Sequence, residues 1–352
     1  MTMHYVNYDA IAGRSVMVTG AGGSIGAELV WQIAASRPKN LILVDSSEFN
    51  LYEVNARLEA AIIVSGHVRL PAIADVRDLD TMRHLFVTEK PDIVFHAAAL
   101  KHVPLLENDH NLVEAVRTNV MGTKNIADLC ASNGVDMVMV STDKAMYPSS
   151  VMGLTKRVAE IYVHAIALRY PNSRIAQVRF GNVMGSSGSV LPKFQKQIAA
   201  GGPVTVTHPE MTRYMMTITQ AVALVLSAAT LHQTSDDRFG LYILDMGKPV
   251  NIYDLAISLI EQAGFRPYTD IPIEMIGIRP GEKLHEQLTY EWEVLKHTEI
   301  GGVSRAVPKV NPERAKGGME QLIWEAGRRR VEGVKTALTS IVPEYSGVGV
   351  WA

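Results

Sequence analysis

Short apolar runs alternate with amphipathic stretches through the first half of this 352-residue chain. The amphipathic stretches, such as AELVWQIAAS and NLYEVNARLEAA, have helical periodicity. The apolar runs are rich in β-branched residues and nearly unbroken, which predicts strands buried in a parallel sheet. This alternation predicts the α/β class, with a doubly wound parallel sheet over residues 1–180. The predicted strands are Ser15–Thr19, Leu41–Asp45, His67–Asp75, Asp92–Ala98, Asp136–Thr142 and Ile175–Phe180.

The pattern changes after about Gly181. GNVMGSSGSV is predicted to be a loop, PKFQKQIAAGGP a short helix, and ITQAVALVLSAATLH and NIYDLAISLIEQAGF longer helices. LYILDMG and IPIEMIG are predicted to be short strands. We expect residues 181–352 to form mainly a smaller lobe over the carboxyl edge of the sheet, where such sheets bind ligands, although the chain can cross back to the sheet. The charged run ERAKGGMEQLIWEAGRRR is interpreted as a solvated helix face, with a basic patch at Arg328–Arg330 as the alternative.

Composition and charge narrow the classes of partner. A formal net charge of −2 gives no basic field for nucleic acid. The single cysteine, Cys130, excludes an internal disulfide framework and fits a reducing compartment. The N-terminus lacks the pattern of a signal peptide, and the longest apolar run, residues 221–231, is far shorter than the ~20 residues that span a bilayer. We expect a soluble, cytoplasmic protein without a membrane segment or a nucleic-acid partner.

A glycine-rich turn follows the first predicted strand in VTGAGGSIGAELVWQI. Gly20, Gly23 and Gly26 have a G-x-x-G-x-x-G spacing, which differs from the strict dinucleotide fingerprint G-x-G-x-x-G. Glycines permit a tight turn and a close backbone approach, and the N-terminus of the following helix then faces a pyrophosphate. Such turns also arise for packing alone, but this one lies between a predicted strand and a predicted helix. It therefore predicts a Rossmann-type dinucleotide site.

Asp45 ends the second predicted strand, where an acid binds the adenosine ribose hydroxyls. A helix N-cap is the alternative interpretation. Because a carboxylate repels a 2′-phosphate and no arginine stands beside Asp45, we expect NAD rather than NADP. In DVRD, Asp75 and Val76 are expected to flank the adenine, whereas Asp78 can equally be a helix cap.

The segment STDKAMYPSSVMGLTK, residues 141–156, has the layout of a dehydrogenase active site. Ser141 and Thr142 end a predicted strand, and Ser150 is a predicted N-cap. Met152 and Lys156 lie four residues apart and so share one face of the following helix. An ammonium there can hold a nicotinamide ribose, whereas the alternative is a solvated helix lysine. The predicted cofactor site comprises Gly20, Gly23, Ser24, Ile25, Gly26, Asp45, Asp75, Val76, Ala97, Ala98 and Lys156.

These motifs together resemble an extended short-chain dehydrogenase/reductase. Within that group the chain is similar to the UDP-N-acetylglucosamine 4,6-dehydratases of bacterial polysaccharide and glycoprotein-sugar synthesis. One branch of that family has tyrosine four residues before the lysine. The branch related to large membrane-anchored dehydratases has methionine there, as at Met152, and its STDKA motif carries the chemistry. The matching blocks are VTGAGGSIGAEL, DSSEFNLYE, DVRD, VFHAAALKHVPLLE, TNVMGTKNI, STDKA, VMGLTKR, VRFGNVMGSSGSVLPKF, THPEMTRYMMT, LDMGKPVNIYDLA and IRPGEKLHEQL.

The sequence departs from the methionine branch in three places. It lacks a membrane-spanning N-terminal region, so we expect a free-standing catalytic domain. Leu100 stands where the branch more often has tyrosine, and Met146 and Tyr147 follow the DKA motif.

The resemblance implies a tightly held NAD and a UDP-sugar substrate, UDP-N-acetylglucosamine or a relative. In the implied reaction, hydride leaves C4, a proton leaves C5, water leaves C6, and the hydride returns to C6. We assign Lys144 as the C5 base, Asp143 as the acid at the C6 hydroxyl, and Thr142 as a contact of the C4 oxygen. The acceptor of the C4 hydroxyl proton stays open between Asp143 and a water, since Met152 carries no proton. A lysine base must be neutral, so we expect its surroundings to depress the pKa of Lys144, although ion pairing opposes this. The alternative for this pair is an exposed turn with a surface ion pair.

The same resemblance implies the substrate contacts. Lys101 and His102 are assigned to the sugar pocket, Asn182 and Ser189 to the nucleotide, and Glu282 to the uridine ribose. Arg213 and Arg279 can bind the diphosphate in forked fashion, with surface salt bridges as the alternative. A structural histidine is the alternative for His102. A homo-oligomer, a dimer or a larger assembly, is expected.

No metal site is predicted, because His102 and His110 lack partnering cysteines and no HExxH motif occurs.

From the family resemblance, the leading hypothesis is a UDP-N-acetylglucosamine 4,6-dehydratase that retains the C5 configuration. A C5-inverting dehydratase or a 4-epimerase of a UDP-sugar is the first alternative. A catalytically inactive, dinucleotide-sensing protein, favoured by the missing tyrosine, is the second.

Overall fold

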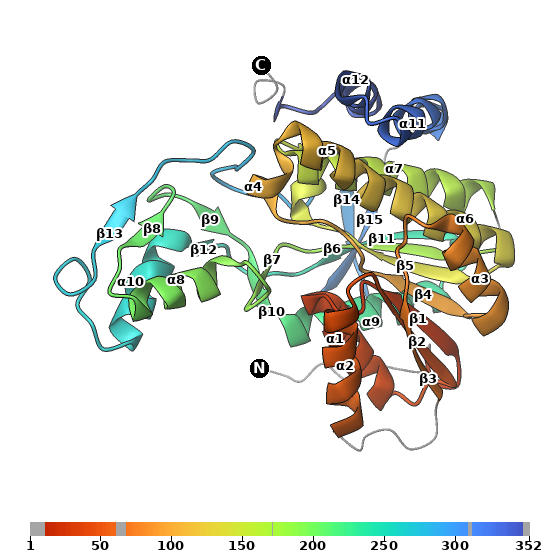
Figure 1. Ribbon diagram of the computed structural model, residues 1–352, viewed down its shortest axis with the longest axis horizontal. Coiled ribbons are helices and arrows are strands. Elements are labelled where there is room, and N and C mark those ends of the chain that lie inside the picture. Colours follow the sequence, from red (N-terminus) through yellow and green to blue (C-terminus); the bar gives the residue numbers. More distant parts are fainter. Residues whose placement is uncertain (1–10, 61–67, 171, 309–311, 348–352) are drawn as a thin grey trace.

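The computed structural model describes residues 11–60, 68–170, 172–308 and 312–347. The N-terminal residues on which the signal-peptide prediction rests, and His67 of the third predicted strand, lie outside these ranges. A nine-stranded sheet forms the centre of the molecule in the order β14-β15-β11-β6-β5-β4-β1-β2-β3 (Figure 1). All six predicted strands are present and parallel. They are β1 (Ser15–Thr19), β2 (Asn40–Asp45), β3 (Val68–Ile73), β4 (Ile93–His96), β5 (Asp136–Val140) and β6 (Ile175–Arg179).

Helices cover both faces of this sheet, so central strands such as β1 and β6 are buried on both sides, as their unbroken apolar sequences predict. One face packs against α1 (Ser24–Ala35), α2 (Glu48–Ala60) and α9 (Ile218–Thr234). The other packs against α3 (Leu79–Glu89), α6 (Thr123–Asn133) and α7 (Val151–Arg169). The predicted doubly wound α/β architecture is therefore confirmed, and the strand order reverses between β1 and β4, where such sheets bind ligands.

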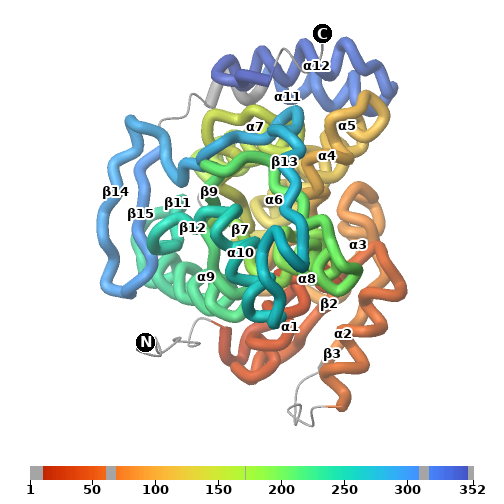
Figure 2. Tube along the Cα trace, turned by 90° about the vertical axis from the view of Figure 1, so that its left-hand side faces the viewer, coloured from red at the N-terminus to blue at the C-terminus, as the bar shows by residue number. Residues whose placement is uncertain are grey.

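A third layer of helices lies outside α7, on the side away from the sheet (Figure 2). It contains α11 (Pro312–Gly327) and α12 (Val331–Ile341), which pack on α7 and α5 (Asp109–Ala115). The charged run predicted as a solvated helix face forms α11 and the residues just after it. One side of α11 is nevertheless buried, through Met319, Leu322 and Ala326.

The small lobe is built from three two-stranded sheets and two helices, at the left of Figure 1. Its core contains Phe194, Val204, Ile252 and Ile260. The segment GNVMGSSGSV was expected to be a loop, but three of its residues form β7 because they pair with β10. The lobe contains β7 (Asn182–Met184), β8 (Val204–Val206), β9 (Thr212–Arg213), β10 (Met215–Thr217), β12 (Val250–Asn251), β13 (Ile273–Met275), α8 (Val190–Ala199) and α10 (Ile252–Gln262).

The second half of the chain also returns to the main sheet. It contributes β11 (Phe239–Leu244) parallel to β6, and then β15 (Val303–Val307) and β14 (Val294–His297) as antiparallel edge strands. The division of the chain near residue 180 stays a prediction. Within the described ranges, no helix is both long and apolar enough to cross a membrane.

A buried ion network joins β6 to the rest of the molecule. Arg179 is 1% exposed and donates to both carboxylate oxygens of Glu160 and both of Glu293, at 2.7–2.9 Å. Glu160 also accepts from Ser141 at 2.7 Å and pairs with Arg157 at 3.3 Å. Each charge in this network is therefore neutralised by partners from distant parts of the chain.

We predict that Arg179→Met lowers the free energy of unfolding by about 3–5 kcal/mol, because it leaves the carboxylates of Glu160 and Glu293 buried without their main partner. Urea denaturation measures this change. The matched control is Arg83→Met, which breaks an exposed ion pair with Asp80 and should change stability little. A loss for Arg179→Met no larger than that of the control would contradict the prediction.

Candidate active site

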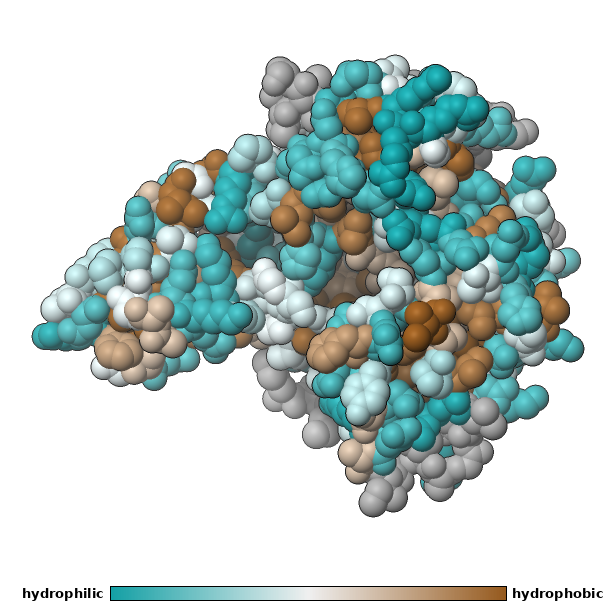
Figure 3. All heavy atoms as spheres, in the orientation of Figure 1, coloured by the Kyte–Doolittle hydropathy of each residue, from teal (hydrophilic) through white to brown (hydrophobic). Residues whose placement is uncertain are grey.

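A cavity of about 420 Å³ opens between the carboxyl edge of the sheet and the small lobe. In the space-filling view the surface is hollowed between these two parts (Figure 3). Residues from both parts line it, with Ile25, Ala97 and Thr142 from the sheet side and Thr205 of β8 and Arg213 of β9 from the small lobe. Predicted cofactor, catalytic and substrate residues therefore meet in one place.

The glycine-rich turn is shaped for close backbone contact. Gly20 has φ +71°, and a Cβ there would lie 2.6 Å from the backbone nitrogen of Ala98. A Cβ on Gly26 would lie 1.9 Å from the carbonyl oxygen of Gly20. Gly23 is the N-cap of α1 and offers no side chain to the free N–H groups of the first turn, where Ser24 and Ile25 lie. These features fit a dinucleotide whose pyrophosphate accepts hydrogen bonds from the free N–H groups at the N-terminus of α1.

Asp45 lies beside this turn at the end of β2. Its carboxylate accepts from the backbone N–H of Gly22 at 2.8 Å and from that of Ser47 at 2.9 Å. The carboxylate is thus fixed next to the glycines, in a position that fits a ribose. Its preference for NAD stays a prediction.

The DVRD residues divide between two roles. Asp78 caps α3 by accepting from the backbone N–H groups of Asp80 and Thr81, which confirms the alternative for that residue. Asp75 is engaged by Arg77 at 2.8 Å, and Val76 is buried. Their proposed place beside an adenine stays a prediction.

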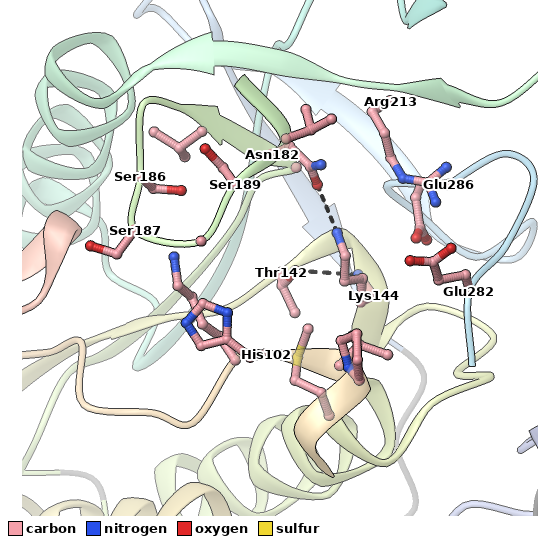
Figure 4. A pocket seen from close by; sticks show the side chains of 18 of the residues that line it. His102, Thr142, Lys144, Asn182, Ser186, Ser187, Ser189, Arg213, Glu282 and Glu286 are labelled. Atoms are coloured by element: carbon pink, nitrogen blue, oxygen red, sulfur yellow. Dashed lines mark hydrogen bonds between the residues drawn. The ribbon is translucent and has the colours of Figure 1, made fainter. Parts of the chain in front are cut away.

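The STDKA motif lies at the end of β5, and Figure 4 shows two of its residues, Thr142 and Lys144, beside the cavity. Asp143 is 0% exposed, which excludes the exposed-turn interpretation. Its Oδ1 accepts from Lys144 Nζ at 3.0 Å and from the Thr142 hydroxyl at 2.9 Å, whereas its Oδ2 is buried without a hydrogen-bond partner among the described residues. Lys144 Nζ also donates to Asn182 Oδ1 at 2.8 Å. The amine is thereby held between the sheet and the small lobe.

The expectation of a depressed lysine pKa is wrong. Burial lowers the pKa of Lys144, but the negative charges of Asp143 and Glu286 and the hydrogen bond to Asp143 more than offset it, so the pKa is raised. In the ligand-free protein Lys144 is therefore an ammonium. It becomes a base only by passing a proton to a neighbour, and the hydrogen-bonded Asp143 is placed to receive it.

Helix α7 carries the other two predicted catalytic side chains. Ser150 caps the helix as predicted, accepting from the backbone N–H of Gly153 at 3.1 Å. Met152 and Lys156 are about 5% exposed and line the cavity, so Lys156 is not a solvated helix lysine. Lys156 Nζ donates to the carbonyl oxygen of Val140 at 2.7 Å, and burial lowers the pKa of Lys156 to about 8.

The predicted substrate residues lie around the same cavity. Arg213 lines it too, but its guanidinium donates to the carbonyl oxygens of Thr212, Lys283 and Leu284 at 2.7–3.1 Å. It thus ties β9 to the IRPGEKLHEQL segment. The proposed contacts with substrate stay predictions for all seven residues, which are Lys101, His102, Asn182, Ser189, Arg213, Arg279 and Glu282.

Glu286 is a cavity residue that the sequence reasoning missed. Its side chain is 4% exposed, it pairs with Lys283 at 3.4 Å, and its Oε2 has no hydrogen-bond partner among the described residues. Figure 4 shows Glu286, Glu282 and Arg213 on one side of the cavity. The signal was a second acid four residues after Glu282 in a block that already matched the family.

Lys193 and Asn119 were also missed. Lys193 lines the cavity, and its Nζ donates to Thr205 at 2.7 Å. Asn119 lies in a π-helical segment, Val116–Gly122, and its side chain bonds both the N–H and the C=O of Leu100, at 2.7 and 2.9 Å. That contact positions the loop carrying Lys101 and His102. A π-helical turn gives no distinct periodic signal over so short a stretch.

Comparison of the sequence and the fold with known proteins assigns the chain to a family. The model of the family described as "Polysaccharide biosynthesis protein" matches residues 16–308. The probable polysaccharide biosynthesis protein EpsC of Bacillus subtilis is 47% identical over 289 residues, which is 81% of this chain and 46% of EpsC. The chain thus spans about half the length of that relative.

Two further relatives match over most of their length. A UDP-glucose 4-epimerase of Rickettsia typhi is 36% identical, over 83% of this chain and 82% of its own. A UDP-N-acetylglucosamine 4,6-dehydratase (inverting) of Campylobacter jejuni is 32% identical, over 80% and 81%. Among solved structures, the X-ray structure of Pen from Bacillus thuringiensis has a TM-score of 0.74 and 30% identity, and covers 86% of this chain and 88% of Pen.

Among the described residues, no group of three or more His, Cys, Asp or Glu side chains is arranged to hold a metal ion.

We predict that Gly26→Ala weakens dinucleotide binding at least about tenfold, because the new Cβ would collide with the Gly20 carbonyl and distort the turn. Calorimetric titration with NAD measures the affinity, and circular dichroism verifies the fold. Gly317→Ala is the matched control, since a Cβ there meets nothing within 4 Å. Unchanged NAD affinity in Gly26→Ala would refute the cofactor site.

Proposed function

We propose that this chain, which belongs to the polysaccharide biosynthesis family of nucleotide-sugar dehydratases and epimerases within the extended short-chain dehydrogenases/reductases, is an NAD-dependent UDP-N-acetylglucosamine 4,6-dehydratase. The product is a UDP-2-acetamido-2,6-dideoxy-4-keto-hexose. The observation that carries the proposal is the ion pair of buried Asp143 with partly exposed Lys144, whose lysine lines one cavity with Met152 and Lys156.

The chain's own residues divide the work of binding. The glycine turn and the N-terminus of α1 would hold the pyrophosphate of NAD, Asp45 its adenosine ribose, and Lys156 its nicotinamide ribose. NAD, when bound there, supplies a hydride acceptor for C4 of the sugar and a hydride donor for C6. Residues of the small lobe hold the UDP moiety over the catalytic cluster.

Asp143 and Lys144 act as one proton-handling unit. The hydrogen bond of 3.0 Å between them allows Lys144 to pass a proton to Asp143, which leaves a neutral amine and a carboxylic acid. The amine then removes the C5 proton, which a C4 ketone acidifies, and the acid protonates the C6 hydroxyl as it leaves as water. Thr142 contacts the C4 oxygen. The C4 hydroxyl proton goes to a water, because Asp143 holds the proton passed from Lys144 and Met152 cannot accept one.

Retention of the C5 configuration is part of the proposal, since the blocks THPEMTRY, LDMGKP and RPGEKL resemble the methionine branch. The second candidate is a UDP-sugar 4-epimerase, favoured by the relative of that name in Rickettsia typhi. An epimerase exchanges hydride at C4 only and needs no base at C5. An epimerase therefore has no use for Lys144 as a C5 base, although the Asp143 carboxylate could still accept the C4 hydroxyl proton.

The first experiment is NMR of the purified protein with UDP-N-acetylglucosamine in heavy water. A 4-keto-6-deoxy product with deuterium at C5 supports dehydration, and the ring couplings report retention or inversion. A C4-epimerised sugar without deuterium would support the epimerase instead. Bound NAD with every UDP-sugar unchanged would support the inactive sensor.

We predict that Lys144→Ala and Asp143→Asn each lower kcat at least about a hundredfold, because each removes one half of the proton transfer. NAD content should stay at the wild-type level. Met152→Ala is the matched control in the same cavity, and its loss should be several-fold at most. Near-normal turnover in Lys144→Ala would show that the proton assignment is wrong.

We also predict a pH shift in Glu286→Gln. The carboxylate of Glu286 raises the pKa of Lys144, so its removal lowers that pKa. Because the proposed pair works with one shared proton, activity is lost when alkaline solution removes that proton, so the falling limb of kcat/KM against pH moves to lower pH. Glu282→Gln, in the same cavity wall, should raise KM without moving that limb. A limb that stays in place in Glu286→Gln would contradict the electrostatic coupling.

A further inference from the structure

The catalytic pair and the catalytic helix are joined by a short loop, residues 145–150. Lys144 precedes this loop, and Met152 and Lys156 follow it on α7. Ala145 and Met146 are fully buried, and Tyr147 has φ +40°, a backbone conformation that a residue with a side chain adopts only when its surroundings hold it. The loop therefore sets the position of Lys144 relative to the helix.

Residues from the segment after the small lobe hold the first part of this loop. Lys283 Nζ donates to the carbonyl oxygen of Met146 at 2.6 Å, and the hydroxyl of Tyr290 donates to the carbonyl oxygen of Ala145 at 3.4 Å. The rings of Tyr147 and Tyr290 meet edge to face, with centroids 4.6 Å apart. All these residues lie within the span that matches the family model.

The second part of the loop is held by the chain that follows α12. The backbone N–H of Ser346 donates to the carbonyl oxygen of Pro148 at 3.1 Å, and its hydroxyl donates to the same oxygen at 3.3 Å. Gly347 lies so close that a Cβ on it would be 2.5 Å from the carbonyl oxygen of Ser149. These residues lie beyond the family match, which ends at residue 308.

Glu344 links the two sets of contacts. Its Oε1 accepts from the hydroxyl of Tyr290 at 3.1 Å and from Arg157 Nε at 3.3 Å. The guanidinium of Arg157 also stacks on the Tyr290 ring, 4.6 Å from its centroid. Burial of Tyr290 and the charges of Glu344 and Glu160 raise the pKa of that tyrosine, so its hydroxyl remains a donor. Glu344 thus fixes the ring against which Tyr147 packs.

The packing of α11 and α12 holds this tail in place in the absence of substrate. Both helices share one apolar cluster with α7, which includes Val151 and Met152 at the start of α7. Members of that cluster from the two outer helices are 0–3% exposed, namely Met319, Leu322, Ala326, Val334, Ala337, Leu338 and Ile341. Hydrophobic burial on this scale anchors the tail next to the loop.

We propose that residues 342–347 form a positioning element of the active site, which fixes loop 145–150 and thereby the placement of Lys144 against the catalytic helix. Its effect on turnover rests on the proposed function, whereas its effect on the loop does not. Displacement of a reacting group by about 1 Å can cost around a hundredfold in rate. A segment that fixes the loop next to Lys144 therefore affects kcat even though it does not touch the substrate. Glu344 and Ser346 are positioning residues, since neither touches the reacting atoms.

The test uses matched variants of the full chain. Ser346→Pro removes the backbone N–H that donates to Pro148, whereas Ser346→Ala keeps it and loses only the hydroxyl. Glu344→Ala removes the link to Tyr290, whereas Glu344→Gln keeps an acceptor oxygen there. Glu332→Ala, at an exposed position of α12, is the control for the outer layer.

Hydrogen–deuterium exchange at the amides of loop 145–150, where every residue except Pro148 has an N–H, and steady-state kinetics with UDP-N-acetylglucosamine are the two readouts. We expect Ser346→Pro and Glu344→Ala to speed exchange in the loop and to lower kcat about tenfold, with KM and NAD content near wild type. Ser346→Ala, Glu344→Gln and Glu332→Ala should lie close to wild type.

Wild-type loop exchange in Glu344→Ala would overturn the proposal, and so would faster exchange with unchanged kcat. If Ser346→Pro does not fold, the pair Glu344→Ala and Glu344→Gln decides by itself. If the wild-type chain leaves UDP-N-acetylglucosamine unchanged, the proposed function fails, and exchange in the loop still tests the anchoring.

Discussion

The ion pair between buried Asp143 and partly exposed Lys144 is the constraint on which the rest of the site depends. A charge removed from water is costly unless partners surround it, so these two groups recruit residues from several distant segments. Asn182 approaches from β7 and Glu286 from the segment after the small lobe. The cavity lies where the sheet and the lobe meet because these partners come from both.

The same constraint sets the resting protonation state. Carboxylates around Lys144 favour its ammonium form, which is inactive as a base, although proton transfer to Asp143 is one hydrogen bond away. The mechanism that we propose has no need of a tyrosine, because it assigns the proton donor and the acceptor to residues adjacent in the chain. Met152 then contributes an apolar wall beside Lys156 rather than a proton.

Much of the fold could be predicted because its signals are local. Six strands, the helices between them, the Ser150 cap and the glycine turn all appear as periodicity or as residue types with fixed backbone preferences. Short strands such as β7, and the pairing of β14 with β15, could not be predicted in this way. Their few residues have no periodic signature, and their partners lie far away in the chain.

The sequence by itself determined the α/β class, the family resemblance and the residue types that meet around the site, since these depend on local pattern and on blocks of matching residues. Only the tertiary structure decided the charge state of Lys144, the recruitment of Glu286 and the engagement of Arg213 by backbone carbonyls. Only the tertiary structure places Glu344 and Ser346 next to loop 145–150. The physical reason is that pKa values and hydrogen bonds depend on distances between atoms. Those distances are set by contacts between segments far apart in the sequence, and such contacts produce no local sequence pattern.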